Sequence, residues 1–359
     1  MSVALLRSEF FTAELDGQPV GLFTLRNRQG GQVAVTNLGA KLMQWLVPDR
    51  HGQMGDVLLG YDSLEGVMAG HASMNAFIAR YANRIAQARF TLDGQPVQLV
   101  ANSGAHCVHG GPHGSRHRVF TAQRLSEQSL ALHLSFADGE GGFPGTLALT
   151  VTYTLGDDHS LDIAWQARTT DKPTVFNATG HAFFNLTGDA SQPITGHVLS
   201  VPASRVLQVD AQLIPTGQLR DVAGTPMDFR QPKPIGQDLH AADEQLAHGK
   251  GYDHFYVLDA APGPDGLALA ATLSEPISGR VLQVWTTEPG VQVFSGNHLG
   301  SAAGSADVGK GGRRMVQHGA VCLEPSGYPD APNHANFPST MLRPGEVRTG
   351  RIVYRSLTD

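Results

Sequence analysis

The stretch Leu147-Ala148-Leu149-Thr150-Val151-Thr152-Tyr153-Thr154-Leu155 alternates large apolar residues with small or polar ones. A β-strand turns successive side chains to opposite faces, so this alternation predicts a strand with one buried and one solvated face. The same period occurs in the flanking residues 130–136 and 161–166, and the turn-forming Gly156-Asp157-Asp158 separates the second pair of runs. Short, half-buried strands joined by tight turns are typical of antiparallel sheets.

The rest of the chain continues this pattern. The sequence contains 42 glycines and 21 prolines, which suits many turns between short strands. Helical periodicity is weak and is best near residues 62–68 and 237–246. No repeat of solenoid or propeller length occurs, and no linker divides the 359 residues. We therefore expect an all-β protein, a large single antiparallel β-sandwich that occupies residues 1–359 as one domain.

Charge and apolar patterning exclude several classes of partner. The net charge of −6 argues against a nucleic-acid groove and against a polybasic membrane surface, but is compatible with a small neutral ligand. No apolar run reaches the length that spans a membrane, and the first residues lack the apolar core of a leader peptide. We expect a cytoplasmic protein with a small-molecule ligand and with neither nucleic-acid nor membrane partners.

One carboxylate stands in an unusual setting near the end of the chain. An apolar run leads into Cys322-Leu323-Glu324-Pro325-Ser326-Gly327-Tyr328-Pro329-Asp330-Ala331-Pro332-Asn333-His334, in which three prolines follow the glutamate. If this run is a strand, Val321 and Leu323 face one way while Cys322 and Glu324 face the other. A rigid segment of this kind can hold a base still, although a surface glutamate before a turn has the same local sequence.

The sixteen histidines and several polar motifs offer further candidates, each weak when taken alone. In the motif His109-Gly110-Gly111, the glycines predict a backbone that approaches a ligand closely. The other motifs place histidine, amide, carboxylate or guanidinium groups beside turns or aromatic residues. They are Tyr81-Ala82-Asn83-Arg84-Ile85, 177–186 around His181, Gly251-Tyr252-Asp253-His254-Phe255 and 285–292 ending at Gln292.

Other chemistries find little support. The two cysteines, Cys107 and Cys322, form no disulfide framework and no compact zinc motif, and free buried thiols are the commoner interpretation. A metal cluster of His106, Cys107, His109 and Cys322 is a minor alternative, because Cys322 is remote in sequence. A Gly-x-Ser-x-Gly elbow, a P-loop and a Gly-x-Gly-x-x-Gly fingerprint are all absent from the sequence.

Taken together and in this order, the motifs resemble the aldose 1-epimerase, or galactose mutarotase, family over nearly the whole chain. The segments that carry the resemblance are Asn83-Arg84, His109-Gly110-Gly111, 138–145, His181 with Phe184-Asn185-Leu186, Asp253-His254, 285–292, Gly296-Asn297, and Glu324 with 329–333. The resemblance implies a β-sandwich of the galactose-mutarotase type. It also implies that the protein interconverts the α and β anomers of a free aldose such as galactose or glucose, with no cofactor and no metal.

The same resemblance assigns roles to individual residues. Glu324 corresponds to the family's catalytic general base and His181 to its general acid. The groups that correspond to its sugar-binding residues are Asn83, Arg84, His109, Asp253 and Gln292. These residue types suit the reaction, because ring opening removes a proton from the C1 hydroxyl and delivers one to the ring oxygen. A nearby carboxylate would also favour the charged form of the imidazole.

The sequence departs from the family pattern at three places. Gly180 stands where asparagine is common, Phe183 where tyrosine is common, and Pro325-Ser326 where the family often has Thr-Gln. We expect the departures to affect the preferred sugar and to give a broad aldose range that extends to pentoses.

Two other functions stay open at this point. One is a hexose-6-phosphate 1-epimerase, for which the basic residues Lys310, Arg313 and Arg314 would hold the phosphate. The other is a catalytically silent carbohydrate-binding β-sandwich, which has no need of an acid or a base. Either a monomer or a homodimer is compatible with the sequence.

Overall fold

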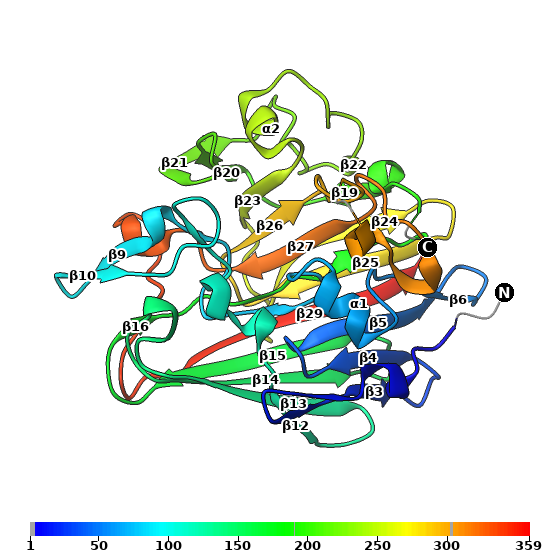
Figure 1. The fold of residues 1–359 in the computed structure, drawn as a ribbon. Coiled ribbons are helices and arrows are strands. Elements are labelled where there is room, and N and C mark those ends of the chain that lie inside the picture. Colours follow the sequence, from blue (N-terminus) through cyan, green and yellow to red (C-terminus); the bar gives the residue numbers. More distant parts are fainter. Residues whose placement is uncertain (1–3, 190, 302–303) are drawn as a thin grey trace.

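The structure is a computed structural model that describes residues 4–189, 191–301 and 304–359 (Figure 1). Three antiparallel sheets form its framework, and the largest has nine strands. In spatial order these strands are β12 (Thr121–Arg124), β13 (Ser129–Phe136), β14 (Leu147–Leu155), β15 (Leu161–Thr169), β29 (Arg348–Thr358), β25 (Arg280–Thr286), β24 (Ala268–Glu275), β19 (Val198–Ser200) and β22 (Lys233–Pro234).

Two smaller sheets lie against the large one. The six-stranded sheet has the order β18 (Phe183–Phe184), β27 (Val321–Ser326), β26 (Gly290–Phe294), β23 (Asp253–Val257), β20 (Arg205–Val209) and β21 (Pro215–Asp221). The four-stranded sheet has the order β3 (Leu22–Arg26), β4 (Gln32–Thr36), β5 (Lys41–Pro48) and β6 (Met54–Asp56).

The remaining elements are short. Five two-stranded sheets pair β1 (Ala13–Leu15) with β2 (Gln18–Val20), β9 (Arg89–Leu92) with β10 (Gln95–Gln98), β8 (Arg84–Ile85) with β11 (Cys107–Val108), β16 (Thr174–Val175) with β28 (Met341–Leu342), and β7 (Phe77–Ile78) with β17 (Thr179–Gly180). The two α-helices are α1 (Leu64–Ala69) and α2 (Glu244–Gly249), and neither of these described helices is long enough to cross a membrane. Single 3-10 turns lie at Ser8–Phe11, Ala86–Ala88, Gly111–His113, Ser115–His117, Glu140–Gly142, Ile194–Gly196, Gly304–Asp307, Lys310–Gly312 and Ala331–Asn333.

The alternation seen in the sequence produces the core. Along β14, Leu147, Leu149, Val151, Tyr153 and Leu155 are all buried, and the intervening residues are half-buried. These buried side chains belong to one apolar cluster that also contains the inward residues of the six-stranded sheet, such as Val291, Val293 and Leu323, and of the four-stranded sheet, such as Val33 and Val35. The core therefore lies between the large sheet and the two smaller ones, as in a β-sandwich.

The predicted fold class is confirmed. The sheets are antiparallel, and the strands predicted at 130–136, 147–155 and 161–166 are β13, β14 and β15. The two helical predictions were partly correct, since α1 occupies the first region but α2 begins only at Glu244. Asp243 caps α2 by accepting hydrogen bonds from Gln245 N–H and Leu246 N–H.

Candidate active site

The side chains of strand β27 alternate between the main core and the face that carries the predicted general base. Val321 and Leu323 point into the main core, whereas Cys322 and Glu324 point to the opposite face. Glu324 lies inside the strand and is only 4% exposed, so the alternative of a surface glutamate before a turn is wrong. The strand ends at Ser326, immediately before the proline-rich loop.

The register of the six-stranded sheet brings two more predicted residues beside Glu324. Gln292 on β26 lies directly opposite Glu324, and residues opposite each other in an antiparallel pair share one face of the sheet. Asp253, the first residue of β23, lies on the next strand. The Gln292 side-chain amide donates a hydrogen bond of 2.6 Å to the Asp253 carboxylate. Three predicted site residues therefore come from three adjacent strands.

His181 reaches this face from the connection between β17 and β18. The backbone N–H of His181 donates to Ala76 O, and Asn75 N–H donates to His181 O. The side chain of Asn75 adds two hydrogen bonds nearby. Its oxygen accepts from Phe183 N–H at 2.9 Å, and its amide donates to Leu59 O at 2.6 Å. The backbone of His181 is thus fixed on its N-terminal side by Ala76 and on its C-terminal side by Asn75.

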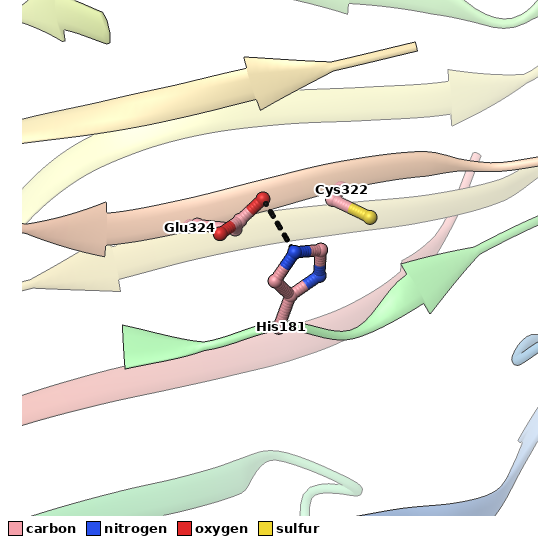
Figure 2. A group of neighbouring side chains, drawn as sticks. All are labelled: His181, Cys322 and Glu324. Atoms are coloured by element: carbon pink, nitrogen blue, oxygen red, sulfur yellow. Dashed lines mark ion pairs between the residues drawn. The ribbon is translucent and has the colours of Figure 1, made fainter. Parts of the chain in front are cut away.

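The imidazole of His181 and the carboxylate of Glu324 face each other (Figure 2). Their Nε2 and Oε1 atoms are 3.5 Å apart, and His181 is 6% exposed. The ring of Phe183 stacks on the imidazole with centroids 5.2 Å apart and an interplanar angle of 10°. Among the described atoms, Nδ1 of His181 has no hydrogen-bond partner. Nothing in these contacts would block a proton transfer at Nε2.

Burial decides the protonation preferences of this pair. Removal from water lowers the pKa of His181 to about 4, because a charged imidazole is poorly solvated there. The same effect, together with the charge of Asp253, raises the pKa of Glu324 well above its usual value. The expectation that a neighbouring carboxylate keeps His181 charged is therefore wrong for the site without sugar. Both groups favour their neutral forms.

A second group of predicted residues comes from the small sheet of β8 and β11. Val108 pairs with Arg84, so Asn83 and His109 lie side by side at its end. Asn83 N–H donates to Nδ1 of His109 at 3.2 Å, which leaves Nε2 of His109 as the protonated nitrogen of the neutral ring. Burial keeps the pKa of His109 well below its usual value. The ring of His109 lies 5.1 Å from that of His181, between centroids.

An ion pair joins the two groups. The guanidinium of Arg84 lies 3.6 Å from the Asp253 carboxylate, and it also donates to the side-chain oxygen of Asn83. A narrow cavity is lined by Asn83, Arg84, Asp253 and Gln292 together with apolar residues from β20, β21, β23 and their loops. All seven predicted residues are therefore connected through contacts with one another. This arrangement offers donors and acceptors to a polyol beside the His181–Glu324 pair.

The glycines after His109 lie in a tight turn, and their predicted close approach to a ligand stays a prediction. Gly110 and Gly111 both have left-handed φ angles, of 77° and 74°. A Cβ atom would meet Ala79 O at 2.9 Å on Gly110 and Val100 O at 3.0 Å on Gly111. Both positions therefore require glycine, because the turn that follows His109 packs against the protein's own backbone.

The sequence analysis did not predict that Asn75 and Phe183 contribute to the site. Asn75 fixes the backbone around His181, and Phe183 supplies the stacked ring, although only its departure from the family pattern was noted. Asn75 has a φ angle of 58°, which asparagine tolerates better than most residues. A lone asparagine in Met74-Asn75-Ala76-Phe77 carries no sequence signal for that role, which depends on a contact with a segment more than one hundred residues away.

The alternative metal cluster does not form. Nδ1 of His106 accepts from Gln87 N–H, Nε2 of His106 pairs with Gln212, and Cys107 lies in a core cluster separate from that of Cys322. Within the described ranges, the metal-ligating side chains that do gather are His181, Cys322 and Glu324.

Two of the three basic residues considered for a phosphate, Lys310 and Arg313, are engaged elsewhere, and no ion pair is found for Arg314 among the described residues. Lys310 pairs with Asp56 at 2.7 Å and Arg313 with Asp189 at 3.1 Å. Both line a separate cavity of 1380 Å³, which contains none of the seven predicted residues.

Comparison with known proteins agrees with this geometry. The family model described as aldose 1-epimerase matches residues 21–355. The aldose 1-epimerase of Escherichia coli K12 is 39% identical over 346 residues, covering 96% of this chain and 97% of that protein. The galactose mutarotase of Bos taurus is 37% identical over 344 residues and 96% of each chain.

Solved structures give the same result at the level of the fold. The GalM/aldose epimerase homologue from C. elegans has a TM-score of 0.85 and 29% identity, covering 94% of this chain and 99% of that one. Galactose 1-epimerase from Lactobacillus acidophilus has a TM-score of 0.83 and 26% identity, covering 99% of each chain. With a family model that matches most of the sequence and relatives this similar over nearly their whole length, the chain belongs to the aldose 1-epimerase family.

Proposed function

We propose that this isomerase interconverts the α and β anomers of free aldoses, with Glu324 and His181 exchanging protons with the sugar. The observation that carries the proposal is the 3.5 Å approach of the two buried side chains, beside groups that can form hydrogen bonds with a polyol. A catalytically silent sugar-binding protein has no need of such a pair. A sugar-phosphate substrate is disfavoured, because Lys310 and Arg313 are paired with carboxylates outside the pocket.

The reaction follows from the positions of the two protons. In the complex with the ring-closed sugar, the Glu324 carboxylate takes the proton of the C1 hydroxyl while the protonated His181 gives its Nε2 proton to the ring oxygen. The C1–O bond to the ring oxygen breaks, which produces an aldehyde at C1 and a hydroxyl at C5. Rotation about C1–C2 presents the other face of the aldehyde. On closure the C5 hydroxyl attacks C1 and returns its proton to His181, while Glu324 gives its proton to the new C1 hydroxyl, so both residues regain their starting states.

Burial of the two residues favours the protonation states that they have after ring opening. Opening the ring converts a carboxylate and an imidazolium into a carboxylic acid and a neutral imidazole. A site that raises the pKa of Glu324 and lowers the pKa of His181 favours the second, uncharged pair. The pocket therefore stabilises the protonation state that accompanies the open-chain sugar.

The remaining predicted residues would hold the sugar. Nε2–H of His109 is a donor, the Asp253 carboxylate is an acceptor, and Arg84 supplies further donors to the sugar hydroxyls. Pro325 and Ser326 continue β27 beyond Glu324 and carry no long amide, which supports a broad aldose range that includes pentoses. Cytoplasmic location and a monomeric or homodimeric state complete the proposal.

Polarimetry on freshly dissolved α-D-glucose or α-D-galactose, corrected for spontaneous mutarotation, tests the activity. Glu324→Gln, His181→Asn and the double variant should all lose most of kcat, since one proton transfer achieves little without the other. General acid or base assistance is worth about 10²–10⁴-fold. If the two single losses multiply in the double variant, the residues act independently and the paired mechanism is wrong.

Glu275→Gln provides the matched control. Glu275 is 5% exposed, close to the value for Glu324, but it lies at the end of β24 and accepts hydrogen bonds from Ile277 N–H and Ser278 N–H. This variant should keep its mutarotation rate even where its thermal stability falls. A loss of activity equal to that of Glu324→Gln would show that any buried glutamate matters equally.

A further inference from the structure

Cys322 is a thiol beside the catalytic pair that the proposed reaction leaves unused. It lies two residues before Glu324 on β27 and therefore on the same face of the strand. The potential ligand atoms of His181, Cys322 and Glu324 all lie within 4.8 Å of one another, and Figure 2 shows both strand side chains beside the imidazole.

These three side chains have the character of a zinc-binding set. Thiolate, imidazole and carboxylate are the ligands that Zn²⁺ takes in proteins, at about 2.0–2.3 Å. Ligand atoms around a tetrahedral ion of that size lie roughly 3.3–3.8 Å apart. The Nε2–Oε1 distance of 3.5 Å already fits, and rotation of Cys322 about its single side-chain torsion changes the position of its sulfur.

The electrostatics of the pocket favour a divalent cation as well. A thiolate and a carboxylate together neutralise the two charges of the ion, and a sulfur ligand selects zinc-like metals over Mg²⁺. Arg84, whose positive charge acts on Glu324, is paired with Asp253. Three protein ligands would leave a fourth position for water, as in open zinc sites.

We propose that His181, Cys322 and Glu324 form an inhibitory binding site for thiophilic divalent cations such as Zn²⁺, occupied in competition with the sugar. Binding requires the Cys322 thiol and the Glu324 carboxylic acid each to release a proton to solvent, and it engages the same imidazole and carboxylate that exchange protons with the aldose. A bound ion therefore removes both the acid and the base. The proposal rests on the proposed function only for its activity readout, because metal binding is measured separately.

Direct binding is the first test. Co²⁺ added to the full chain should produce a thiolate-to-metal charge-transfer band, which appears only when a cysteine is a ligand. Cys322→Ala should abolish the band. It should also weaken Zn²⁺ affinity, measured by competition with a chromophoric chelator, by at least about 10–100-fold, since losing only a hydrogen-bond partner of a metal ligand typically has an effect of this size. Cys107→Ala is the matched control, since Cys107 is the only other cysteine and is also buried, and should change neither result.

Inhibition is the second test. Zn²⁺ should slow mutarotation with an apparent inhibition constant that rises with sugar concentration, and Mg²⁺ should not. The ratio of the rates with and without Zn²⁺ should approach one in Cys322→Ala and also in Cys322→Ser, which retains a side chain of similar size. Absence of the cobalt band in the wild type, or Zn²⁺ affinity unchanged in both Cys322 variants, overturns the proposal. If the band appears but no mutarotation is found with any aldose, the metal site stands and the proposed function fails.

Discussion

His181 has an aromatic ring stacked on one face and two proton-carrying groups, His109 and Glu324, near its edge. Phe183 excludes water from that face, which contributes to the low pKa of the imidazole. The pair formed by His181 and Glu324 works only when it holds a single proton in total. Because His181 has the lower pKa and Glu324 the higher, the pair holds one proton only between these two pKa values, and activity should be limited to that pH range.

We predict a bell-shaped pH profile of kcat/KM. The acidic limb should fall as His181 gains its proton near pH about 4, because the pair then holds two protons and lacks a base. The alkaline limb should fall at a pH above the usual glutamate range, where Glu324 loses its proton and the pair lacks an acid. Polarimetry across this range checks the form. An activity that keeps increasing with pH through neutrality would show that the pair does not share a proton.

A second prediction separates the two neighbouring histidines. His181→Asn should collapse kcat, since Nε2 of His181 is the atom beside Glu324. His109→Asn should retain more turnover and mainly raise KM, because Nδ1 of His109 is occupied by Asn83 N–H and only its Nε2–H is available to the sugar. The measurement is kcat and KM of both variants with one aldose. The reverse ranking would exchange the two roles.

At the scale of elements, the connection between β17 and β18 depends on Asn75. We predict that Asn75→Gly, which tolerates the left-handed backbone, lowers kcat and destabilises the protein by about 1–3 kcal/mol, because two buried hydrogen bonds to Phe183 N–H and Leu59 O are lost. Substrate KM should change less than kcat. Chemical denaturation measures the change in unfolding free energy, and polarimetry measures kcat and KM.

Asn37→Ala is the control for this effect. Asn37 is as buried as Asn75, at 3% exposure, and its side chain bonds to Gly21, Pro19 and Phe120, none of which touches the site. The control should lose stability while keeping kcat. Equal losses of kcat in both variants would mean that Asn75 acts through global stability and has no specific role in positioning His181.

Strand β5 contains a buried cation with a consequence for stability. Lys41 is 3% exposed and donates a hydrogen bond to Ala72 O, and burial lowers its pKa from 10.5 to about 7. Between these two values the unfolded chain binds more protons at Lys41 than the folded one, so this residue makes stability rise with pH. We predict that Lys41→Met reduces the increase in unfolding free energy between pH about 7 and pH about 8.5, measured by urea denaturation. An identical increase in both proteins would contradict the prediction.

The predictability of individual elements differed for physical reasons. Strands such as β14 could be predicted from their sequence, because one buried face imposes a period of two on the residues themselves. The face of β27 that carries Glu324 followed from the same rule. The support that Asn75 gives to His181 could not be predicted, since it depends on which loops the finished fold brings together. The protonation of His181 was predicted wrongly, because sequence reveals a neighbouring carboxylate but not the extent of burial.

At the scale of the whole molecule, the seven predicted residues come from six separate parts of the chain and meet beside one face of the six-stranded sheet. The motifs and their order predicted which residues these are, through the resemblance to a family. The distances among them required the fold. The organisation of residues 1–359 as one domain stays a prediction.

The arrangement of the site predicts activity without a metal. The reaction needs only the protons of Glu324 and His181, and the other predicted groups are hydrogen-bonding partners of a polyol. Mutarotation should therefore survive dialysis against EDTA, with a rate equal to or above that of the untreated protein if traces of zinc are removed. Loss of activity in EDTA that a divalent ion restores would contradict this prediction.

The position of β29 affects how the protein is made. This strand, residues 348–358, lies between β15 and β25 in the middle of the nine-stranded sheet (Figure 1). During synthesis, the strands on its two sides are complete long before it leaves the ribosome. Until then the sheet consists of two halves, each with a long, unpaired edge of the kind that recruits other chains. The nascent protein is thus most exposed to aggregation until β29 has been synthesised, and a chaperone that covers those edges would act before that point.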